Sequence, residues 1–262
     1  MRKLYWADLT TEEFKTLDPE KTIAVLPIAA MEQHGPHLAV SVDTVINEGM
    51  IAETMKILPD DLSVLVMPTQ AIGKSNEHIR SPGTLTFSAE TALRAWVEIG
   101  ECVHRAGLRK IVMVNSHGGN VDLISIVCRE LRVRFQMLAV SCNWGRLGSP
   151  PGLHTELESA VGIHAGDNET SMMLYFRPDR VRMDKAKNFA PSTIQIAKEF
   201  DLLRPTGLNA FGWIAQDIHP DGAAGDASVA TAEKGKLAAE HRAKEFVKLL
   251  RDMTRFDLKR LA

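Results

Sequence analysis

Four side chains that could bind a metal ion occur close together early in the chain: Glu32, His34, His37 and Asp43. Glu32 and His34 are two positions apart, so on an extended loop both side chains point the same way. Carboxylates and imidazoles without thiolates are ligands for zinc, manganese or iron rather than for a sulfur-held structural site. A polar loop that only caps a helix is the alternative, and this cluster alone supports the two interpretations equally.

Two later stretches add groups of the same chemistry: His117 in the turn NSHGGN, and His164 with Glu169 in GIHAGDNETS. A set of five groups is enough for two divalent ions that share one carboxylate: Glu32, His34, Asp43, His117 and Glu169. Such a pair of ions acidifies a bridging water and stabilises the oxyanion that forms on attack. The glycines of NSHGGN favour clearance for a substrate over phosphate binding, because GxGxxG and a phosphate-loop Lys-Ser/Thr pair are absent.

Several further polar or aromatic residues are candidates for a substrate pocket. Ser75, Glu77 and His78 lie in the loop GKSNEHIRSPGT, and they are explained equally well as ordinary loop residues. Trp144 follows an apolar segment, where an aromatic side chain is as often plain packing as a pocket wall or lid. The remaining histidines are interpreted as loop residues (His154 and His219) or helix-surface residues (His104 and His241).

The elements that must position these groups alternate between strand and helix. Residues 22–26 form a β-branched apolar run that ends at Pro27, and further strands are predicted at 62–67, 110–114 and 137–142. Helices are predicted between them, at 44–58, 88–105 and 121–135. This alternation is typical of a parallel sheet covered by helices on both faces. Ligands bind at the carboxyl ends of such strands, where the candidate residues are expected to lie.

The ends of the chain are less regular. A short helix is predicted at 10–17, and residues 162–175 are predicted to join a polar loop to a helix whose first turn carries Glu169. Residues 177–228 are rich in Pro, Gly and Asp, and we expect them to cover the site or to form subunit contacts. The last helix, 231–255, should pack as an outer helix through Leu237, Phe246, Leu249 and Leu250. No linker divides the chain, so residues 1–262 are expected to form one domain.

Composition excludes several classes of protein. The chain has 262 residues, 45% of them hydrophobic and 24% charged, with a net charge of -2, which indicates a globular protein without a nucleic-acid or anionic-membrane surface. No apolar stretch approaches the roughly 18 residues that span a bilayer, and no signal peptide precedes the domain, so a cytoplasmic location is expected. The three cysteines, Cys102, Cys128 and Cys142, are scattered and are expected to be reduced core residues.

Five strings in order resemble the creatininase (creatinine amidohydrolase) family: EQHGPH with Asp43, GKSNEH before PGT, NSHGGN, HAGDNETS and DGAAGDASVATAEKG. The resemblance extends from about residue 20 to residue 240. It implies a three-layer α/β/α sandwich, two divalent metal ions (zinc, manganese or iron) and a homo-oligomer, often a hexamer. It also implies hydrolysis of C–N bonds in cyclic amides, formamides or peptide-like substrates.

The resemblance also implies roles for single residues. Glu32 and His117 resemble ligands of one metal, His34 a ligand of the other, and Asp43 the bridging carboxylate. Creatininase itself carries a carboxylate where this chain has Gly119, so Glu169 is predicted as the replacing ligand and as a catalytic group. In addition, His164 resembles a proton-handling histidine, Ser75 a substrate-contacting serine, and Trp144 a mobile tryptophan over the pocket.

Where creatininase has residues that recognise the creatinine ring, this chain has Gly118, Ala160, Val161 and Ile163. We therefore predict hydrolysis of an amide, lactam or formamide other than creatinine, by metal-activated water. Within the same family, hydrolysis of a cyclic ketone or sugar derivative is an alternative. A non-catalytic small-molecule or nucleotide-binding α/β module is another, and it would not hold metal stoichiometrically.

Overall fold

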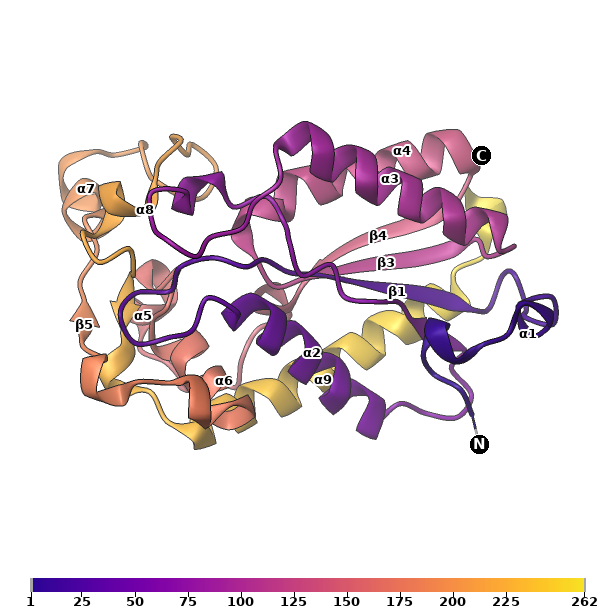
Figure 1. The fold of residues 1–262 in the computed structure, drawn as a ribbon, viewed down its shortest axis with the longest axis horizontal. Helices are drawn as coiled ribbons and strands as arrows, with labels where there is room; N and C mark the ends of the chain where they lie inside the picture. The colour runs from indigo at the N-terminus through magenta and orange to yellow at the C-terminus, as the bar shows by residue number, and fades with distance from the viewer. Residues whose placement is uncertain (1, 262) are drawn as a thin grey trace.

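The fold is built on a central sheet of four parallel strands, in the order β2-β1-β3-β4 (Figure 1). The computed structural model describes residues 2–261. The strands are β1 (Ile23–Ile28), β2 (Val64–Val66), β3 (Lys110–Asn115) and β4 (Leu138–Asn143). Each joins the next through a helix, so all four carboxyl ends meet at one edge. The predicted parallel sheet is confirmed.

Helices cover both faces of this sheet, because the side chains of each central strand point alternately to either side. Ile23 and Val25 pack with residues of α2 (Val42–Lys56), α6 (Asp167–Phe176) and α9 (Ala232–Arg255). Ala24 and Leu26 pack on the opposite face with α3 (Ala89–Arg105) and α4 (Val121–Phe135). Figure 1 shows the resulting layers above and below the sheet. The predicted three-layer α/β/α arrangement is therefore confirmed.

The strand β1 does not end at Pro27, as the sequence predicted, but continues to Ile28. Proline lacks the N–H that a central strand normally donates to its neighbour. The carbonyl of Pro27 accepts from the backbone N–H of Gln70, so this residue faces the β2 side, where β2 has already ended at Val66. No ladder hydrogen bond is lost, and the strand carries the chain further towards Glu32.

Other boundaries differ by a few residues. The second strand spans only Val64–Val66 rather than 62–67, and α1 spans Thr11–Phe14 rather than 10–17. The helix α2 begins at Val42, which places Asp43 inside its first turn.

All three cysteines are free, but Cys102 is exposed rather than buried, because it lies off the apolar stripe of α3.

The helix α9 packs on α6 more closely than large aliphatic residues would allow. A Cβ added to Gly235 would overlap the backbone oxygen of Ser171 on α6. Small residues continue this contact, with Ala238 and Ala239 both buried. Leu237, predicted on the buried face, is 38% exposed instead, so that prediction was wrong. The prediction assumed that large aliphatic residues mark the buried face of α9, whereas small residues, glycine and alanine, lie at the contact with α6.

The irregular segments gather beyond the carboxyl ends of β1 and β3, at the left of Figure 1. They contain α5 (Glu156–Val161), α7 (Thr193–Glu199), α8 (Ala215–Ile218) and the antiparallel pair β5 (Asn188–Phe189) and β6 (Gly225–Asp226). His164 pairs with Ala224 through two backbone hydrogen bonds, which fixes the segment 213–226 beside it. Within residues 2–261, no helix is long and apolar enough to cross a membrane.

Candidate metal centre

Side chains from three separate segments converge at the carboxyl edge of the sheet. Nδ1 of His117, which follows β3, lies 3.2 Å from Oε1 of Glu32 and 3.7 Å from Oδ2 of Asp43. Nε2 of His34 lies 4.0 Å from the same Asp43 oxygen. Glu32, His34, Asp43 and His117 are all buried. Four residues that are spread over 86 positions of sequence thus share one small volume, as the sequence predicted.

Glu169 reaches the same volume from the first turn of α6, with its Oε2 3.6 Å from Nε2 of His34. Among the described residues three groups of candidate ligands result: Glu32/Asp43/His117, His34/Asp43/Glu169 and Glu32/His34/His164. Asp43 belongs to the first two groups. Within each group the ligand atoms lie within 4.8 Å of one another. The structure thus brings Glu169, rather than a residue at position 119, to the second group.

Several oxygen and nitrogen atoms of this cluster are buried without any hydrogen-bond partner. They are both carboxylate oxygens of Glu32, Nε2 of His34 and Oδ2 of Asp43. Leaving buried acceptors unpaired costs about 1–3 kcal/mol each, so proteins rarely leave several together. Divalent cations between them would satisfy all four atoms at once. The donor set of carboxylates and imidazoles fits zinc, manganese or iron.

Backbone carbonyls fix which nitrogen of each histidine faces the cluster. Nδ1 of His34 donates to the carbonyl of Glu32 at 3.0 Å, which leaves Nε2 free to bind a cation. Nε2 of His117 donates to the carbonyl of Lys74 at 3.0 Å, which turns Nδ1 towards Glu32 and Asp43. Both imidazoles are therefore oriented before any ion arrives.

The carboxylates of this cluster are too close to ionise together without added positive charge. Burial and the charge of Glu32 raise the pKa of Asp43 well above its ordinary value. Burial also raises the pKa of Glu169 to about 7. Burial opposes ionisation of Glu32 as well, but the charge of His117 outweighs it and holds the pKa of Glu32 well below its usual range. Glu32 in turn raises the pKa of His117 against its burial.

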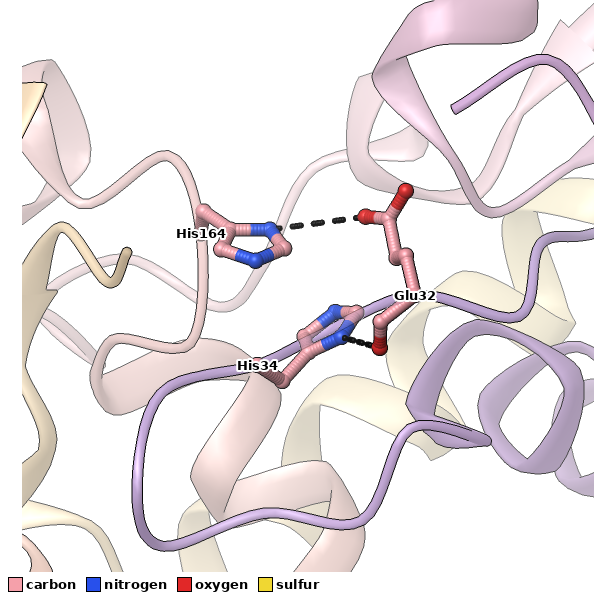
Figure 2. Close-up of side chains that lie close together, drawn as sticks. All are labelled: Glu32, His34 and His164. Atoms are coloured by element: carbon pink, nitrogen blue, oxygen red, sulfur yellow. Dashed lines mark hydrogen bonds and ion pairs between the residues drawn. The ribbon is translucent and has the colours of Figure 1, made fainter. Parts of the chain in front are cut away.

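Two further histidines line the cluster. Nδ1 of His164 lies 3.6 Å from Oε1 of Glu32, and Figure 2 shows the rings of His164 and His34 beside this glutamate. His164 donates from Nε2 to the carbonyl of Gln33 at 2.8 Å. Nε2 of His78 lies 3.4 Å from Oε1 of Glu32. Burial lowers the pKa of both His78 and His164, so both imidazoles are neutral at pH 7.

The sequence analysis missed Gln33, although it lies between two predicted ligands. Its amide nitrogen lies 2.8 Å from Nδ1 of His78 and 3.2 Å from Nε2 of His164, and it donates to the carbonyl of Gly222 at 2.7 Å. Gln33 therefore ties two site histidines to the covering segment. The position of Gln33 between Glu32 and His34 could have indicated a role in the site. However, side chains alternate in direction along an extended loop, which predicts that Gln33 points away from these two residues.

The remaining predicted site residues fall into different places. Oγ of Ser75 and Oε1 of Glu77 lie 3.2 Å and 3.4 Å from Nε2 of His117, on the side of the ring away from the ligand cluster. Gly118 is exposed next to His117, with open space around its Cα. These three residues therefore surround one ligand.

Trp144 lies in the core rather than over a pocket. The side chain is 1% exposed, packs edge-on against Phe246 and donates from its indole nitrogen to Oδ1 of Asn47 at 3.0 Å. An indole held on both sides in this way is not a mobile lid, so that expectation is corrected. His37, from the N-terminal cluster, also turns away, with Nε2 3.0 Å from Oγ1 of Thr170 and its ring stacked on Phe189.

Comparison with known proteins agrees with this geometry. The family model described as creatinine amidohydrolase matches residues 7–250. A mycofactocin precursor peptide peptidase of Mycobacterium ulcerans is 31% identical over 81% of this chain and 78% of that protein. The creatinine amidohydrolase of Pseudomonas putida is 27% identical over 91% of this chain and 93% of that protein.

A 3-dehydro-scyllo-inosose hydrolase of Thermotoga maritima is 27% identical over 97% of this chain and 85% of that protein. Among solved structures, a manganese form of creatininase superimposes with a TM-score of 0.77 at 24% identity, covering 97% of this chain and 100% of that one. The family model spans nearly the whole chain and includes every residue of the metal cluster. The chain therefore belongs to the creatininase family, whose members are metal-dependent hydrolases.

Proposed function

We propose that this protein hydrolyses a C–N bond of a small amide, lactam or formamide other than creatinine, with two divalent ions of zinc, manganese or iron. The observation that carries the proposal is the pair of ligand groups that share Asp43, with four buried atoms left without partners. Glu32, Asp43 and His117 would hold one ion, and His34, Asp43 and Glu169 the other. When bound, the ions supply an acidified water and a positive charge that polarises the scissile carbonyl.

The protein's own groups handle the proton that such a hydrolysis must move. His164 is neutral, and its Nδ1 faces Glu32 because Nε2 donates to Gln33. This nitrogen accepts the proton of the attacking water and then delivers it to the departing amide nitrogen. Gln33 holds the His164 ring in place through its backbone carbonyl, which is a positioning role.

The residues at the positions where creatininase recognises the creatinine ring support a substrate other than creatinine. Gly118 leaves open space next to His117, and Ala160 and Val161 offer neither a ring-stacking surface nor a charge. Relatives in the family are named for a peptide, a cyclic amide and a sugar derivative. The relative named as a peptide peptidase supports an amide substrate that continues as a longer chain on one side of the scissile bond.

A second candidate is hydrolysis of a cyclic ketone of the sugar type. The Thermotoga maritima hydrolase that supports it covers 97% of this chain. The same metal centre could polarise a ring ketone as well as an amide carbonyl. The identity of the metal ligands therefore does not distinguish between the two reactions. Product analysis separates them, because only C–N hydrolysis forms a new amino group.

The test combines metal analysis with an activity screen on metal-loaded protein. We expect two ions per chain in the wild type, fewer than about 0.2 in Asp43→Asn, and one in Glu169→Gln, because only Asp43 serves both groups. The exposed carboxylate of Asp122 on α4 gives a matched control, and Asp122→Asn should keep both ions.

The screen should contain a formamide, a lactam, a peptide amide, creatinine and a cyclic ketone of the sugar type. Turnover of an amide that Asp43→Asn reduces about 10³-fold or more would support the proposal, since such a variant loses the ions that polarise the carbonyl. Stoichiometric metal with turnover of the ketone alone would favour the second candidate. Protein that purifies without transition metal and turns over nothing would indicate a binding module.

A further inference from the structure

A cavity of about 470 Å³ lies at the start of α6, the helix that carries Glu169, and no ligand of the metal centre lines it. Its walls are the turn at 148–154, the helix α5, the first residues of α6, and Arg242 from α9. The volume accommodates a small organic group. Asn168, which lines the cavity, immediately precedes Glu169 of the metal centre.

Arg242 is a buried cation that makes no ion pair among the described residues. Its side chain donates from Nε to the carbonyl of Gly148 at 2.9 Å, and from Nη2 to Ser149 Oγ at 3.1 Å and Asn168 Oδ1 at 2.9 Å. All three acceptors are neutral. Within residues 2–261, Nη1 makes no hydrogen bond, and no carboxylate lies within 4.0 Å of the guanidinium. The residue is only 5% exposed.

The absence of a counter-ion has an energetic consequence. Burial of a charged group is costly unless an opposite charge compensates it. Burial lowers the pKa of Arg242 to about 10, although the charge of Glu169 acts in the opposite direction. A guanidinium at this pKa is still charged at pH 7, so the cavity carries a positive charge that a bound anion would neutralise.

The carboxylate of Glu158 lines the same cavity but does not supply that anion. Oε1 of Glu158 accepts from the backbone N–H of Asp167 and Oε2 from that of Asp226, each at 2.8 Å. Two amide donors therefore hold this carboxylate. The helix α6 also begins at Asp167, and the positive end of the helix dipole favours a negative charge there.

A second polar atom in the cavity wall lacks a partner. His154 is held at Nδ1 by Oδ2 of Asp167, at 2.7 Å, and Lys234 contacts the same carboxylate oxygen at 2.8 Å. Nε2 of His154 is buried and makes no hydrogen bond within the described residues. The imidazole is therefore fixed in direction with one nitrogen unused.

We propose that this cavity binds a carboxylate group of the substrate through Arg242. A planar guanidinium with a free Nη1 matches a carboxylate oxygen in both geometry and charge. This inference rests on the proposed amide hydrolysis, and it narrows the substrate class to amides that carry a carboxylate. Arg242 contacts Asn168, the residue before Glu169, so the anchor lies at the first turn of the helix that carries Glu169.

Binding can be measured separately from catalysis in chelator-treated, metal-free protein. The two probes are N-acetylglycine and N-acetylglycinamide, which share their shape and differ in the charge of one end. By isothermal titration calorimetry, we expect the acid to bind wild-type protein at least about tenfold more tightly than the amide, because charge-assisted hydrogen bonds are the stronger ones. Arg242→Gln should abolish this preference, Arg242→Lys should keep part of it, and the exposed Arg134→Gln should leave it unchanged.

Equal binding of acid and amide by the wild type would overturn the proposal, and so would a preference that survives in Arg242→Gln. Chloride or sulfate that competes as well as N-acetylglycine would show an unspecific anion site, which also contradicts it. Arg242→Gln could unfold, because it loses three hydrogen bonds, but the comparison of the two probes on the wild type remains decisive. Failure of the amide hydrolysis itself would appear differently, as an absence of turnover with carboxylate binding intact.

Discussion

Asp43 occupies the central position of the metal centre. Its Oδ2 lies between Nδ1 of His117 and Nε2 of His34, at 3.7 Å and 4.0 Å, and no hydrogen-bond donor reaches it. A carboxylate without donors and beside other carboxylates is unfavourable unless a proton or a cation is present. The raised pKa of Asp43 shows the same conflict in the metal-free protein.

Gly119 and Glu77 are in close contact on the Nε2 side of the His117 ring, away from the other ligands. A Cβ at position 119 would overlap Oε1 of Glu77 and would lie 2.5 Å from Nε2 of His117. Glu77 therefore occupies the space that a side chain at 119 would need. Burial alone would raise the pKa of Glu77, but His117 and Lys74 together lower it to about 2, so it faces the imidazole as a carboxylate.

At this scale we predict that Gly119→Ala displaces Glu77 and weakens metal binding at the group Glu32/Asp43/His117. Outer carboxylates orient ligand histidines, and their loss reduces metal affinity by about 10–100-fold. Glu77→Gln should act in the same direction, since it removes the charge and keeps the shape. Competition with a chromophoric chelator measures both affinities.

The neighbouring glycine supplies the control for this prediction. A Cβ at Gly118 would meet nothing within 4 Å, so Gly118→Ala should bind metal as the wild type does. Should Gly118→Ala and Gly119→Ala weaken binding equally, the effect would come from the backbone of the turn and not from Glu77.

At the scale of elements, the contact between α6 and α9 positions Glu169. Gly235 of α9 lies against the backbone of Ser171, two residues after Glu169 on α6. A second glycine, Gly100 of α3, lies close to the side chain of Leu131 of α4, on the opposite face of the sheet. The two glycines therefore allow close packing in different layers, of which only one carries a ligand.

We expect Gly235→Ala and Gly100→Ala each to lower the free energy of unfolding by about 1–3 kcal/mol, because overpacking forces the helices apart. Only Gly235→Ala should also weaken metal binding at His34/Asp43/Glu169, since only this substitution moves α6. Thermal unfolding and metal titration of the two variants check the prediction. Equal metal affinities would show that the position of α6 does not control Glu169.

For the whole molecule, the unpaired buried atoms make the stability of the fold depend on cations. An ion that binds only the folded chain stabilises it by about 2.7 kcal/mol at a concentration 100 times its Kd. For a chain of this size each kcal/mol changes the Tm by about 2–4 °C, so a chelator should lower the Tm by about 5–10 °C. Differential scanning calorimetry with and without chelator measures this difference.

The same stabilisation should increase with pH. In the metal-free protein Asp43 and His117 hold protons because their pKa values are raised, and Glu169 titrates near pH 7. A cation must displace these protons, so its apparent affinity rises by up to about tenfold per displaced proton for each pH unit. The increase in Tm on adding metal should therefore be larger at pH 8 than at pH 6. An equal or smaller increase at pH 8 would contradict this assignment of protons.

The sequence by itself determined which chemistry is present and where it enters the fold. Apolar runs that alternate with helical patterns specify a parallel sheet, and a parallel sheet places the residues after its strands at one edge. Glu32 after β1 and His117 after β3 met there for that reason. Spacing also placed Asp43 and Glu169 in the first turns of helices that begin at the same edge.

Only the tertiary structure decided which way each loop side chain points. His37 and Gln33 are both in the first loop, yet His37 packs on Phe189 while Gln33 joins the site histidines. Trp144 is in the core for a similar reason, because Asn47 and Phe246 hold it from distant segments. Loop directions depend on contacts between residues far apart in sequence, and local periodicity carries no information about those contacts. The surroundings of Arg242 were also decided by the tertiary structure, since the residues that it contacts lie far away in sequence, between positions 148 and 168.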